Sequence, residues 1–337
     1  MTRYVVIGGG AVGATVAAQL HLAGTSAVLV ARGAHLAALR AGGLRYVHPT
    51  GTTTVPVPVV GGPDELELTG DDVLVVATKA QDVEGVLAAW AWRPVVGRDV
   101  VAASVLPIVL LQNGLDSERS ALRRFATVFG AVTWSAASHL EPGEVVSPTS
   151  PIAAVFWIGA YPSGTHPALE RLAADFTAAD LAVQVVSDIA RWKAGKLLTI
   201  LPNALTAVYA SSPLRDAAAE ALRAEAKAVF ELIGQPVADF QAESTVDLAG
   251  FAVKPIPGKE RPGSSTWQSV ARGGTVESDY LNGEIVLLAR LHGGSAPLNE
   301  AVLGRVNQAV AAGVEAGSLG DDDLAALLPS VAAALVS

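Results

Sequence analysis

The chain has 337 residues, of which 51% are hydrophobic and 16% are charged, and its formal charge is −9. This length predicts two domains, and the apolar composition excludes intrinsic disorder. The net charge argues against a nucleic-acid partner, because phosphate binding needs a basic surface.

Cysteine is absent, which excludes disulfides, thiolate zinc sites and cysteine nucleophiles and is typical of a reducing cytoplasm. We therefore expect a cytoplasmic protein. The six histidines include no pair four residues apart, so we predict no metal site.

The segment from Tyr4 to Ala31 carries no Lys, Arg, Asp or Glu, a pattern that a signal peptide or a membrane span could share. Glycines and polar residues punctuate it, however. We interpret residues 4–7 as a buried strand, 11–23 as a helix and 27–31 as the next strand, which together form a βαβ unit. We expect no attachment to a membrane.

The turn between this first strand and helix reads Gly8-Gly9-Gly10-Ala11-Val12-Gly13, a G-x-G-x-x-G motif in the strand–turn–helix context that dinucleotide binding requires. Gly8 permits the tight turn, Gly10 lets the backbone approach a pyrophosphate, and Gly13 allows close helix packing. Ala11 and Val12 open the helix whose N-terminus faces the anion. The alternative is an ordinary glycine-rich turn.

Arg32 follows the second strand, where an NAD-binding protein commonly carries an acid that binds the adenosine ribose. A guanidinium at this position pairs with a 2′-phosphate, so Arg32 favours NADPH over NADH. The alternative is a solvated arginine at the end of a strand.

Apolar runs then alternate with helical segments as far as residue 187, which predicts a parallel sheet with helices on both faces. Lys79 and Asn113 follow two of these strands, at the sheet edge where open α/β sheets bind ligands. Each could equally be a surface lysine or a turn asparagine. The strands are expected at 73–77, 108–111, within 129–159 and at 182–186, and the helices at 83–90 and 168–179.

The remainder reads as helical, so we predict an α/β N-terminal Rossmann-like dinucleotide-binding domain at 1–187 followed by an all-α C-terminal domain at 188–337. We interpret the loop 252–265 as a surface crossing, and the apolar C-terminal helices as a possible homodimer contact. The helices are expected at 189–209, 214–233, 276–292, 300–312 and 323–336.

Four polar residues of the helical domain are candidates for chemistry: Lys196, Asn203, Ser265 and Glu277. A lysine in an apolar helix is costly unless its amino group reaches water or a partner. Taken singly, Lys196 could be such a lysine, and Glu277 an exposed carboxylate at a helix start.

Taken together, these residues resemble the ketopantoate reductase family over nearly the whole chain. The resemblance rests on Gly8–Gly13, Arg32, Thr78-Lys79, Leu111–Gly114, Lys196-Leu-Leu with Asn203–Ala207, Ser264-Ser265, Glu277 and Asp279–Gly283.

The resemblance implies reduction of 2-dehydropantoate to pantoate with NADPH, in a Rossmann domain joined to a helical substrate domain. It makes Lys196 the proton donor to the ketone and Glu277 its partner in positioning the substrate. It also places Lys79 and Asn113 at the cofactor and substrate, and gives Asn203 and Ser265 contacts with the substrate, Ser265 near its carboxylate.

Two positions depart from the family pattern: Ile200 stands where an asparagine is common four residues after the lysine, and Ser269 where an acid is common. Losing hydrogen-bonding groups from a polar pocket changes which substrate is accepted. One alternative is therefore a same-fold reductase of another keto acid or a secondary-metabolite ketone, and another is a non-catalytic NADPH-binding protein. Hydrolase and kinase motifs are absent.

Overall fold

The computed structural model describes residues 1–260 and 263–336, and the chain forms two compact units. The first unit comprises Met1–Asn113, Ser117–Trp192 and Asp239–Arg261, and the second comprises Gly114–Asp116, Lys193–Ala238 and Pro262–Ser337. The domain boundary that we expect after residue 187 stays a prediction; it falls inside the first unit.

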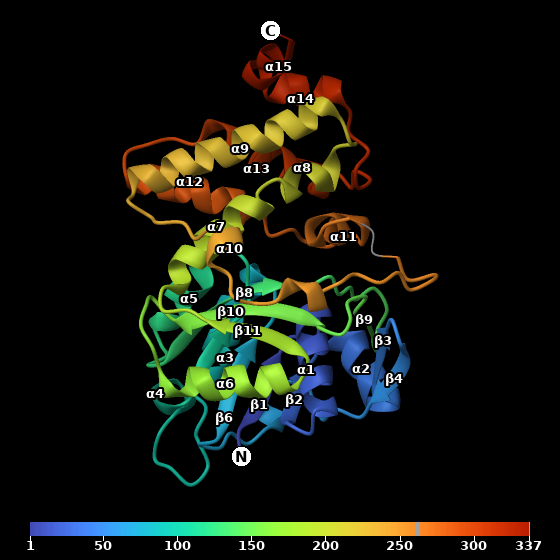
Figure 1. Cartoon of the computed structure of the whole chain (residues 1–337), viewed down its shortest axis with the longest axis vertical. Helices are drawn as coiled ribbons and strands as arrows, with labels where there is room; N and C mark the ends of the chain where they lie inside the picture. The colour runs from blue at the N-terminus through green and yellow to red at the C-terminus, as the bar shows by residue number, and fades with distance from the viewer. Residues whose placement is uncertain (261–262, 337) are drawn as a thin grey trace. The chain divides into compact units, whose positions relative to one another are not determined.

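An eight-stranded sheet forms the centre of the first unit (Figure 1), in the order β11-β10-β8-β7-β6-β1-β2-β5. Neighbouring strands are parallel except for β8 and β10. The strands are β1 (Arg3–Ile7), β2 (Ser26–Val30), β5 (Val59–Val60), β6 (Asp72–Val76), β7 (Ile108–Leu110), β8 (Val128–Trp134), β10 (Ala154–Ala160) and β11 (Leu181–Val185).

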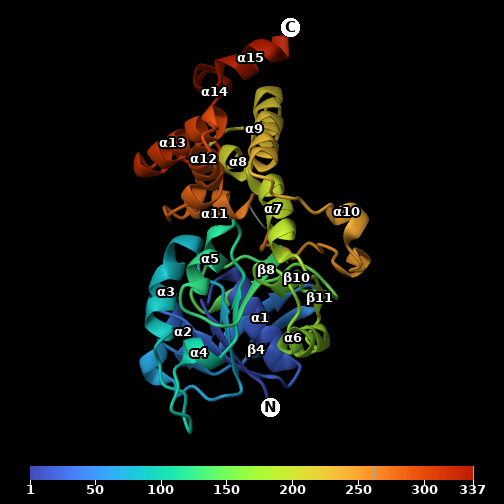
Figure 2. The same cartoon turned by 90° about the vertical axis from the view of Figure 1, so that its left-hand side faces the viewer.

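Helices cover both faces of this sheet, as predicted. Because successive side chains of a strand point to opposite faces, one strand can contribute to two apolar cores. In β1, Tyr4 and Val6 belong to one apolar core, and Val5 and Ile7 belong to another. Figure 2 shows α3 and α6 on opposite sides of the sheet. The first core includes α1 (Ala11–Leu22) and α6 (Pro167–Ala178), and the second includes α3 (Val83–Trp90), α4 (Ala102–Val105) and α5 (Asp116–Leu122).

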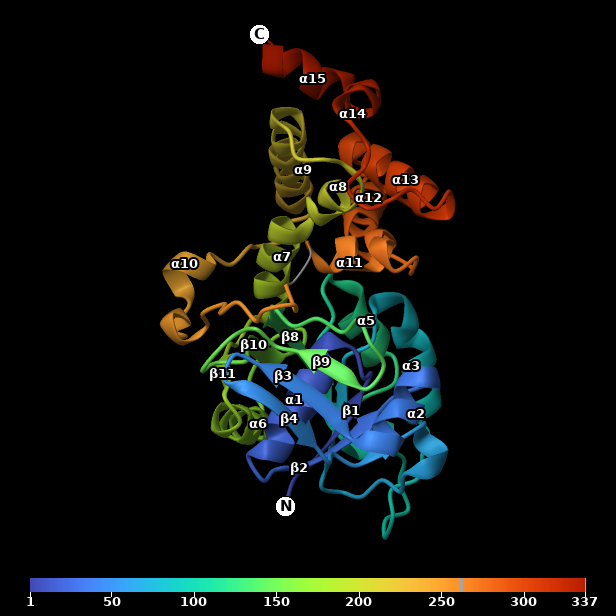
Figure 3. The ribbon, with the colours of Figure 1, turned by 90° about the vertical axis from the view of Figure 1, so that its right-hand side faces the viewer.

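A three-stranded sheet packs against α1 and is visible in Figure 3. A turn in which the Glu144 N–H donates to the Glu141 carbonyl leads into its last strand, and an antiparallel bridge joins Ser138 to Val146. The small sheet consists of β4 (Gly51–Val55), β3 (Leu44–His48) and β9 (Glu144–Val146); α2 (Gly33–Gly42) precedes it, and η1 (Pro63–Glu65) and η2 (Ala80–Asp82) follow β4.

Residues 239–261 return to the first unit after a long excursion of the chain. Phe240, at the start of α10 (Phe240–Glu243), contacts three tryptophan rings at centroid distances of 4.9 to 5.6 Å. These rings belong to Trp134, Trp157 and Trp192. Because aromatic pairs are stabilising beyond the area they bury, this cluster anchors the segment.

Charged groups fix both ends of the returning segment. Arg191 binds the Glu243 carboxylate through two N–H groups, and the Lys259 Nζ lies 2.5 Å from an oxygen of the buried Glu144. The ion pair between Arg191 and Glu243 lowers the pKa of this carboxyl to about 2. The loop 252–265, which we interpret as a surface crossing, therefore follows a segment that Glu243 holds to the first unit. Within the loop, Lys259 is held to the same unit.

The second unit is helical, which confirms the predicted fold class. Its long helix α9 packs on α12 and α13 (Figure 1). Its elements are α7 (Ile189–Ile200), in which the division between the units falls, α8 (Asn203–Val208), α9 (Pro213–Leu232), α11 (Ser265–Ala271), η4 (Ser278–Tyr280), α12 (Asn282–Leu291), α13 (Pro297–Ala311), α14 (Asp321–Leu327) and α15 (Pro329–Val336).

Three helix predictions were wrong in their bounds. The helix expected at 189–209 breaks between Ile200 and Asn203, because Pro202 has no N–H to donate to the preceding turn. Pro329 divides the segment 323–336 into α14 and α15 for the same reason. The helix expected from residue 276 begins only at Asn282, after the short 3-10 turn η4.

Buried amides support the break near Pro202 and the start of α13. The Asn282 Nδ2 lies 3.0 Å from the Asn299 Oδ1 and 3.5 Å from the carbonyl oxygen of Leu201. Asn299 in turn donates to the Leu222 carbonyl and the Glu225 carboxylate, which also accepts from the first backbone N–H groups of α13. This network satisfies backbone groups that would otherwise be buried without partners.

We expect Asn299→Ala to lower the free energy of unfolding by about 1 to 3 kcal/mol, because it leaves buried donors and acceptors unsatisfied. Urea denaturation measures this loss. Asn307→Ala is the matched control on the same helix, since the Asn307 side chain is exposed, and it should cost no more than about 0.5 kcal/mol. Equal small losses in both variants would show that the network contributes little.

Candidate functional site: a glycine turn and its cavity

The turn after β1 is shaped by close backbone packing. Gly8 has φ of +117°, and a Cβ built on it would lie 2.8 Å from the carbonyl carbon of Ala77, just beyond the end of β6. A Cβ on Gly13 would lie 2.0 Å from the Gly8 carbonyl oxygen. Larger residues at either position would push α1 or β6 away from the turn, so these two glycines have the structural reasons that the motif predicts.

Gly10 differs, because a Cβ on it would meet no protein atom within 4 Å. It is the N-cap of the twelve-residue α1, whose first turn contains no acid. The open space beside Gly10 therefore lies next to backbone N–H groups and the positive end of a helix dipole, which together bind anions. A dinucleotide pyrophosphate fits this space, and a side chain at position 10 would occupy it.

Beside the turn lies a cavity of about 620 Å³ in the first unit. It is built at the carboxyl ends of β1, β2 and β6, with walls from α3 and the loop before η1. Of the predicted cofactor residues, the structure brings Gly8, Gly10, Arg32 and Lys79 into its lining. Ala11, Val12 and Gly13 continue from the turn into α1, and Asn113 lies beyond β7 outside this lining.

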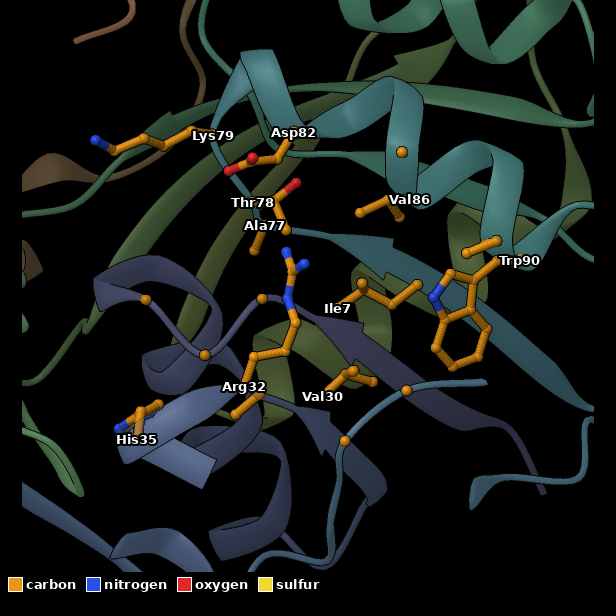
Figure 4. A pocket seen from close by; sticks show the side chains of 18 of the residues that line it. Ile7, Val30, Arg32, His35, Ala77, Thr78, Lys79, Asp82, Val86 and Trp90 are labelled. Atoms are coloured by element: carbon orange, nitrogen blue, oxygen red, sulfur yellow. The ribbon is translucent and has the colours of Figure 1, made fainter. Parts of the chain in front are cut away.

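Arg32 projects from the end of β2 across the cavity, toward Ala77 and Thr78 (Figure 4). Within residues 1–260 and 263–336, no carboxylate forms an ion pair with its guanidinium. Lys79 adds a second cation to the lining, and its side chain extends away from Trp90 in the same view. Asp82 also lines the cavity, but it follows β6 rather than β2.

Gln112 holds the end of β6 in place. Its Nε2 donates to the carbonyl oxygens of Val76 at 3.0 Å and Thr78 at 2.9 Å. The conformation of the Thr78-Lys79 segment therefore depends on a side chain that follows the neighbouring strand β7. Asn113 follows Gln112 directly, at the same edge of the sheet.

His35, which the sequence analysis missed, lies behind the glycine turn. A Cβ on Gly9 would lie 2.8 Å from the His35 ring, so the second residue of the motif is glycine for a steric reason. The Gly143 N–H donates to His35 Nδ1 at 2.9 Å, which puts the proton of the neutral ring on Nε2. Only the position of His35, three residues after Arg32, could have signalled this role.

The His35 ring is held neutral. Burial, and then the neighbouring His139 ring at a centroid distance of 4.3 Å, lower the pKa of His35 to about 4. His139 donates through Nδ1 to the Glu144 carbonyl at 2.8 Å. Both histidines line the cavity, so the wall beside the turn adds hydrogen-bonding groups, and the His35 ring adds no charge near neutral pH.

The remaining predicted residues belong to the second unit. Lys196 on α7 and Glu277, just before η4, are both half-buried, and Ser265 begins α11 in an exposed position. Helix α11 packs on α8, which begins at Asn203, and Asn203 lines a second cavity together with Ser264. The structure thus brings the Asn203 and Ser264-Ser265 segments together.

Both residues that depart from the family pattern are buried in the second unit. Ile200 is buried in the apolar core of the second unit, among residues such as Leu197 and Leu201. Ser269 is buried as well, and its Oγ donates to the Ser265 carbonyl at 3.1 Å. Ile200 therefore contributes packing at a position where an amide would contribute hydrogen bonds.

Among the described residues, no helix is long and apolar enough to cross a membrane.

Two family models match the chain. "Ketopantoate reductase PanE/ApbA" matches residues 4–162, and "Ketopantoate reductase PanE/ApbA C terminal" matches residues 190–310. The 2-dehydropantoate 2-reductase of Pyrococcus horikoshii is 25% identical over 305 residues, which are 87% of this chain and 93% of the relative.

Solved structures are also similar. A ketopantoate reductase of the PanE/ApbA family from Ralstonia eutropha superposes with a TM-score of 0.73 at 25% identity, over 93% of this chain and 99% of its own. D-mandelate dehydrogenase with NADH and anilino(oxo)acetate gives a TM-score of 0.76 at 18% identity, over 93% of this chain and 99% of its own, and shares the fold.

We expect the wild-type protein to lose stability as the pH falls from about 6.5 to about 4, in part through His35. The folded-state pKa lies below the usual histidine value of 6.5, so the unfolded chain binds the proton more readily in this interval. His35→Asn keeps an acceptor for Gly143 but does not titrate, so its Tm should fall less steeply with pH. His292→Asn, at an exposed histidine, is the control and should follow the wild type. Parallel curves for all three proteins would exclude a role for His35.

Proposed function

Because the chain belongs to the ketopantoate reductase family, and so is a nicotinamide-dependent oxidoreductase acting on a ketone or its alcohol, we propose that it reduces a 2-keto acid to a 2-hydroxy acid with NADPH, 2-dehydropantoate being the first candidate. The observation that carries the cofactor assignment is Arg32, a guanidinium without an ion-pair partner in the described residues that projects into a cavity beside a dinucleotide turn.

NADPH differs from NADH by the 2′-phosphate on the adenosine ribose. A guanidinium binds a phosphate through two parallel charge-assisted hydrogen bonds, which supports NADPH. The fold alone is compatible with either cofactor, since D-mandelate dehydrogenase shares it and its structure contains NADH. In this chain the position after β2 holds Arg32 rather than an acid, and an acid there would repel the phosphate.

The bound cofactor supplies the hydride, and the side chains of this chain supply the rest. We assign to Lys196 the donation of a proton to the ketone oxygen as negative charge develops there, and to Glu277 the positioning of the substrate. Asn113, Asn203 and Ser265 bind the substrate, with Ser265 at its carboxylate. A cationic lysine suits this role because it attracts a keto acid and also has a proton to release.

A second candidate is a reductase of another keto acid or ketone in the same fold. The burial of Ile200 in the apolar core favours it, because an amide that could select a polar substrate is missing at this position.

Removing the Arg32 guanidinium should weaken NADPH binding roughly ten- to a hundredfold, the loss expected for charge-assisted hydrogen bonds, and should leave NADH binding nearly unchanged. Titration of the purified Arg32→Ala protein with each cofactor, followed by nicotinamide fluorescence, measures both constants. Arg40→Ala is the control, because Arg40 lies on α2 and pairs with Glu65. Tighter binding of NADH than of NADPH by the wild type would overturn the cofactor assignment.

Lys196→Ala should reduce kcat by about 10² to 10⁴, the contribution of a positioned general acid, while NADPH affinity stays within about twofold. Single-turnover and binding measurements on one preparation separate the two effects. Lys227→Ala, an exposed lysine on α9, should have wild-type activity. Full activity of Lys196→Ala would remove the mechanism, and loss of NADPH binding together with activity would assign Lys196 to the cofactor.

Steady-state assays of 2-dehydropantoate against a panel of bulkier keto acids test the substrate. We expect turnover of 2-dehydropantoate at a kcat/KM equal to or above those of the panel. Negligible turnover of it beside efficient reduction of another keto acid would establish the second candidate. Cofactor binding without turnover of any ketone would point to a binding protein.

A further inference from the structure

The second unit contains a cavity of about 550 Å³ that is separate from the glycine turn. Residues of α8 and α9 line it, together with Gly263, Ser264 and Trp267 and the loop after α13. Among its described lining residues, Arg215 is the one that carries charge. A chain with a net charge of −9 therefore presents a cation in a pocket of its helical unit.

Backbone and side-chain acceptors hold Arg215 in place. One terminal nitrogen donates to the Tyr209 carbonyl at 3.2 Å, and the other donates to the Ser211 Oγ at 3.0 Å. A guanidinium has five N–H groups, so these two bonds leave three for another partner. The geometry is that of an arginine fixed at its position before a ligand arrives.

Nearby carboxylates do not neutralise this guanidinium. Asp216 approaches to 3.9 Å, but its side chain is 77% exposed, and such pairs are weak in water. Asp323 also lies near Tyr209, but it is engaged by two N–H groups of Arg305 and by the Tyr209 hydroxyl. Arg215 therefore keeps most of its positive potential at the cavity.

Neutral polar groups complete the lining. The Asn203 side chain makes no hydrogen bond within the described part of the chain. The Ser264 Oγ accepts from the Trp267 backbone N–H, so its own proton is available to a ligand. An anionic ligand can satisfy these donors together with Arg215, whereas an apolar ligand would cover a cation without pairing it.

We propose that this cavity binds an anionic group at the end of the substrate remote from the reacting ketone, so that among unbranched 2-keto acids of equal chain length the enzyme prefers one with a second carboxylate. The inference rests on the proposed reduction of a 2-keto acid. Asn203 belongs both to the proposed substrate site and to this cavity, whereas Lys196 and Ser265 do not line it. Arg215 thus acts on a different group of the substrate from the carboxylate assigned to Ser265, and a bidentate pair with a carboxylate suits its geometry.

The test compares 2-keto diacids with monoacids of equal chain length: 2-oxoglutarate with 2-oxopentanoate, and 2-oxoadipate with 2-oxohexanoate. The wild type should prefer at least one diacid in kcat/KM by about tenfold or more. Arg215→Met should lower kcat/KM for that diacid roughly ten- to a hundredfold, mainly through KM, and change the monoacid less than about twofold. Arg223→Met is the matched control on α9, since Arg223 pairs with Glu220 on the helix surface.

Other results would overturn the proposal. Equal losses for diacid and monoacid would mean that Arg215 binds the carboxylate common to both or supports the fold, and unchanged kinetics would mean that it binds neither. If Arg215→Met does not fold, Ala210→Glu places a carboxylate at an exposed lining position and should abolish the preference for the diacid. Retention of that preference in Ala210→Glu would contradict the proposal.

A binding measurement separates failure of this inference from failure of the proposed function. Glutarate, which carries no ketone, should change the fluorescence of Trp267 in the wild type, and pentanoate should not; Trp267→Phe identifies the source of the signal. If no keto acid is reduced but glutarate binds through Arg215, the proposed function fails and the anion site stands. If keto acids are reduced and glutarate does not bind, the site fails alone.

Discussion

The fold of the first unit depends on the close approach of three backbone segments: the end of β1, the start of α1 and the end of β6. A Cβ built on Gly13 would lie 2.0 Å from the Gly8 carbonyl oxygen. The helix can therefore approach the turn this closely only if residue 13 is glycine. A Cβ built on Gly8 would likewise be too close to the backbone of the residues after β6. The packing that requires these glycines also creates the space beside Gly10, so the core of the unit and its candidate cofactor site have one geometric origin.

Sequence reasoning was most successful where a residue type has few structural uses. The glycine spacing, the apolar strands and the position of Arg32 predicted the sheet, its helices and the residues at its carboxyl edge. It was less successful with prolines inside a helical pattern: Pro202 and Pro329 end helices that apolar periodicity would continue. The family pattern singles out Lys196 and Glu277 as candidates, which composition alone could not distinguish from ordinary residues of a helical domain, and their roles stay predictions.

Other features depend on partners that are distant in sequence. His35 becomes significant only because Gly143 and His139 lie beside it, more than a hundred residues later. Arg215 becomes a candidate ligand-binding residue only because Ser264 and Trp267, from a much later segment of the chain, line the same cavity. No local pattern encodes such contacts, because they arise when separate segments of the chain pack together.

The returning segment at 239–261 has a consequence for how the protein is made. The ribosome completes the whole eight-stranded sheet before it synthesises Phe240, yet the cage formed by Trp134, Trp157 and Trp192 receives this ring. While α8 and α9 are being translated, these three indole rings therefore lack their contact with Phe240. Exposed apolar surface of this kind invites aggregation and chaperone binding, so synthesis passes through a vulnerable interval that ends once the segment has emerged and docked.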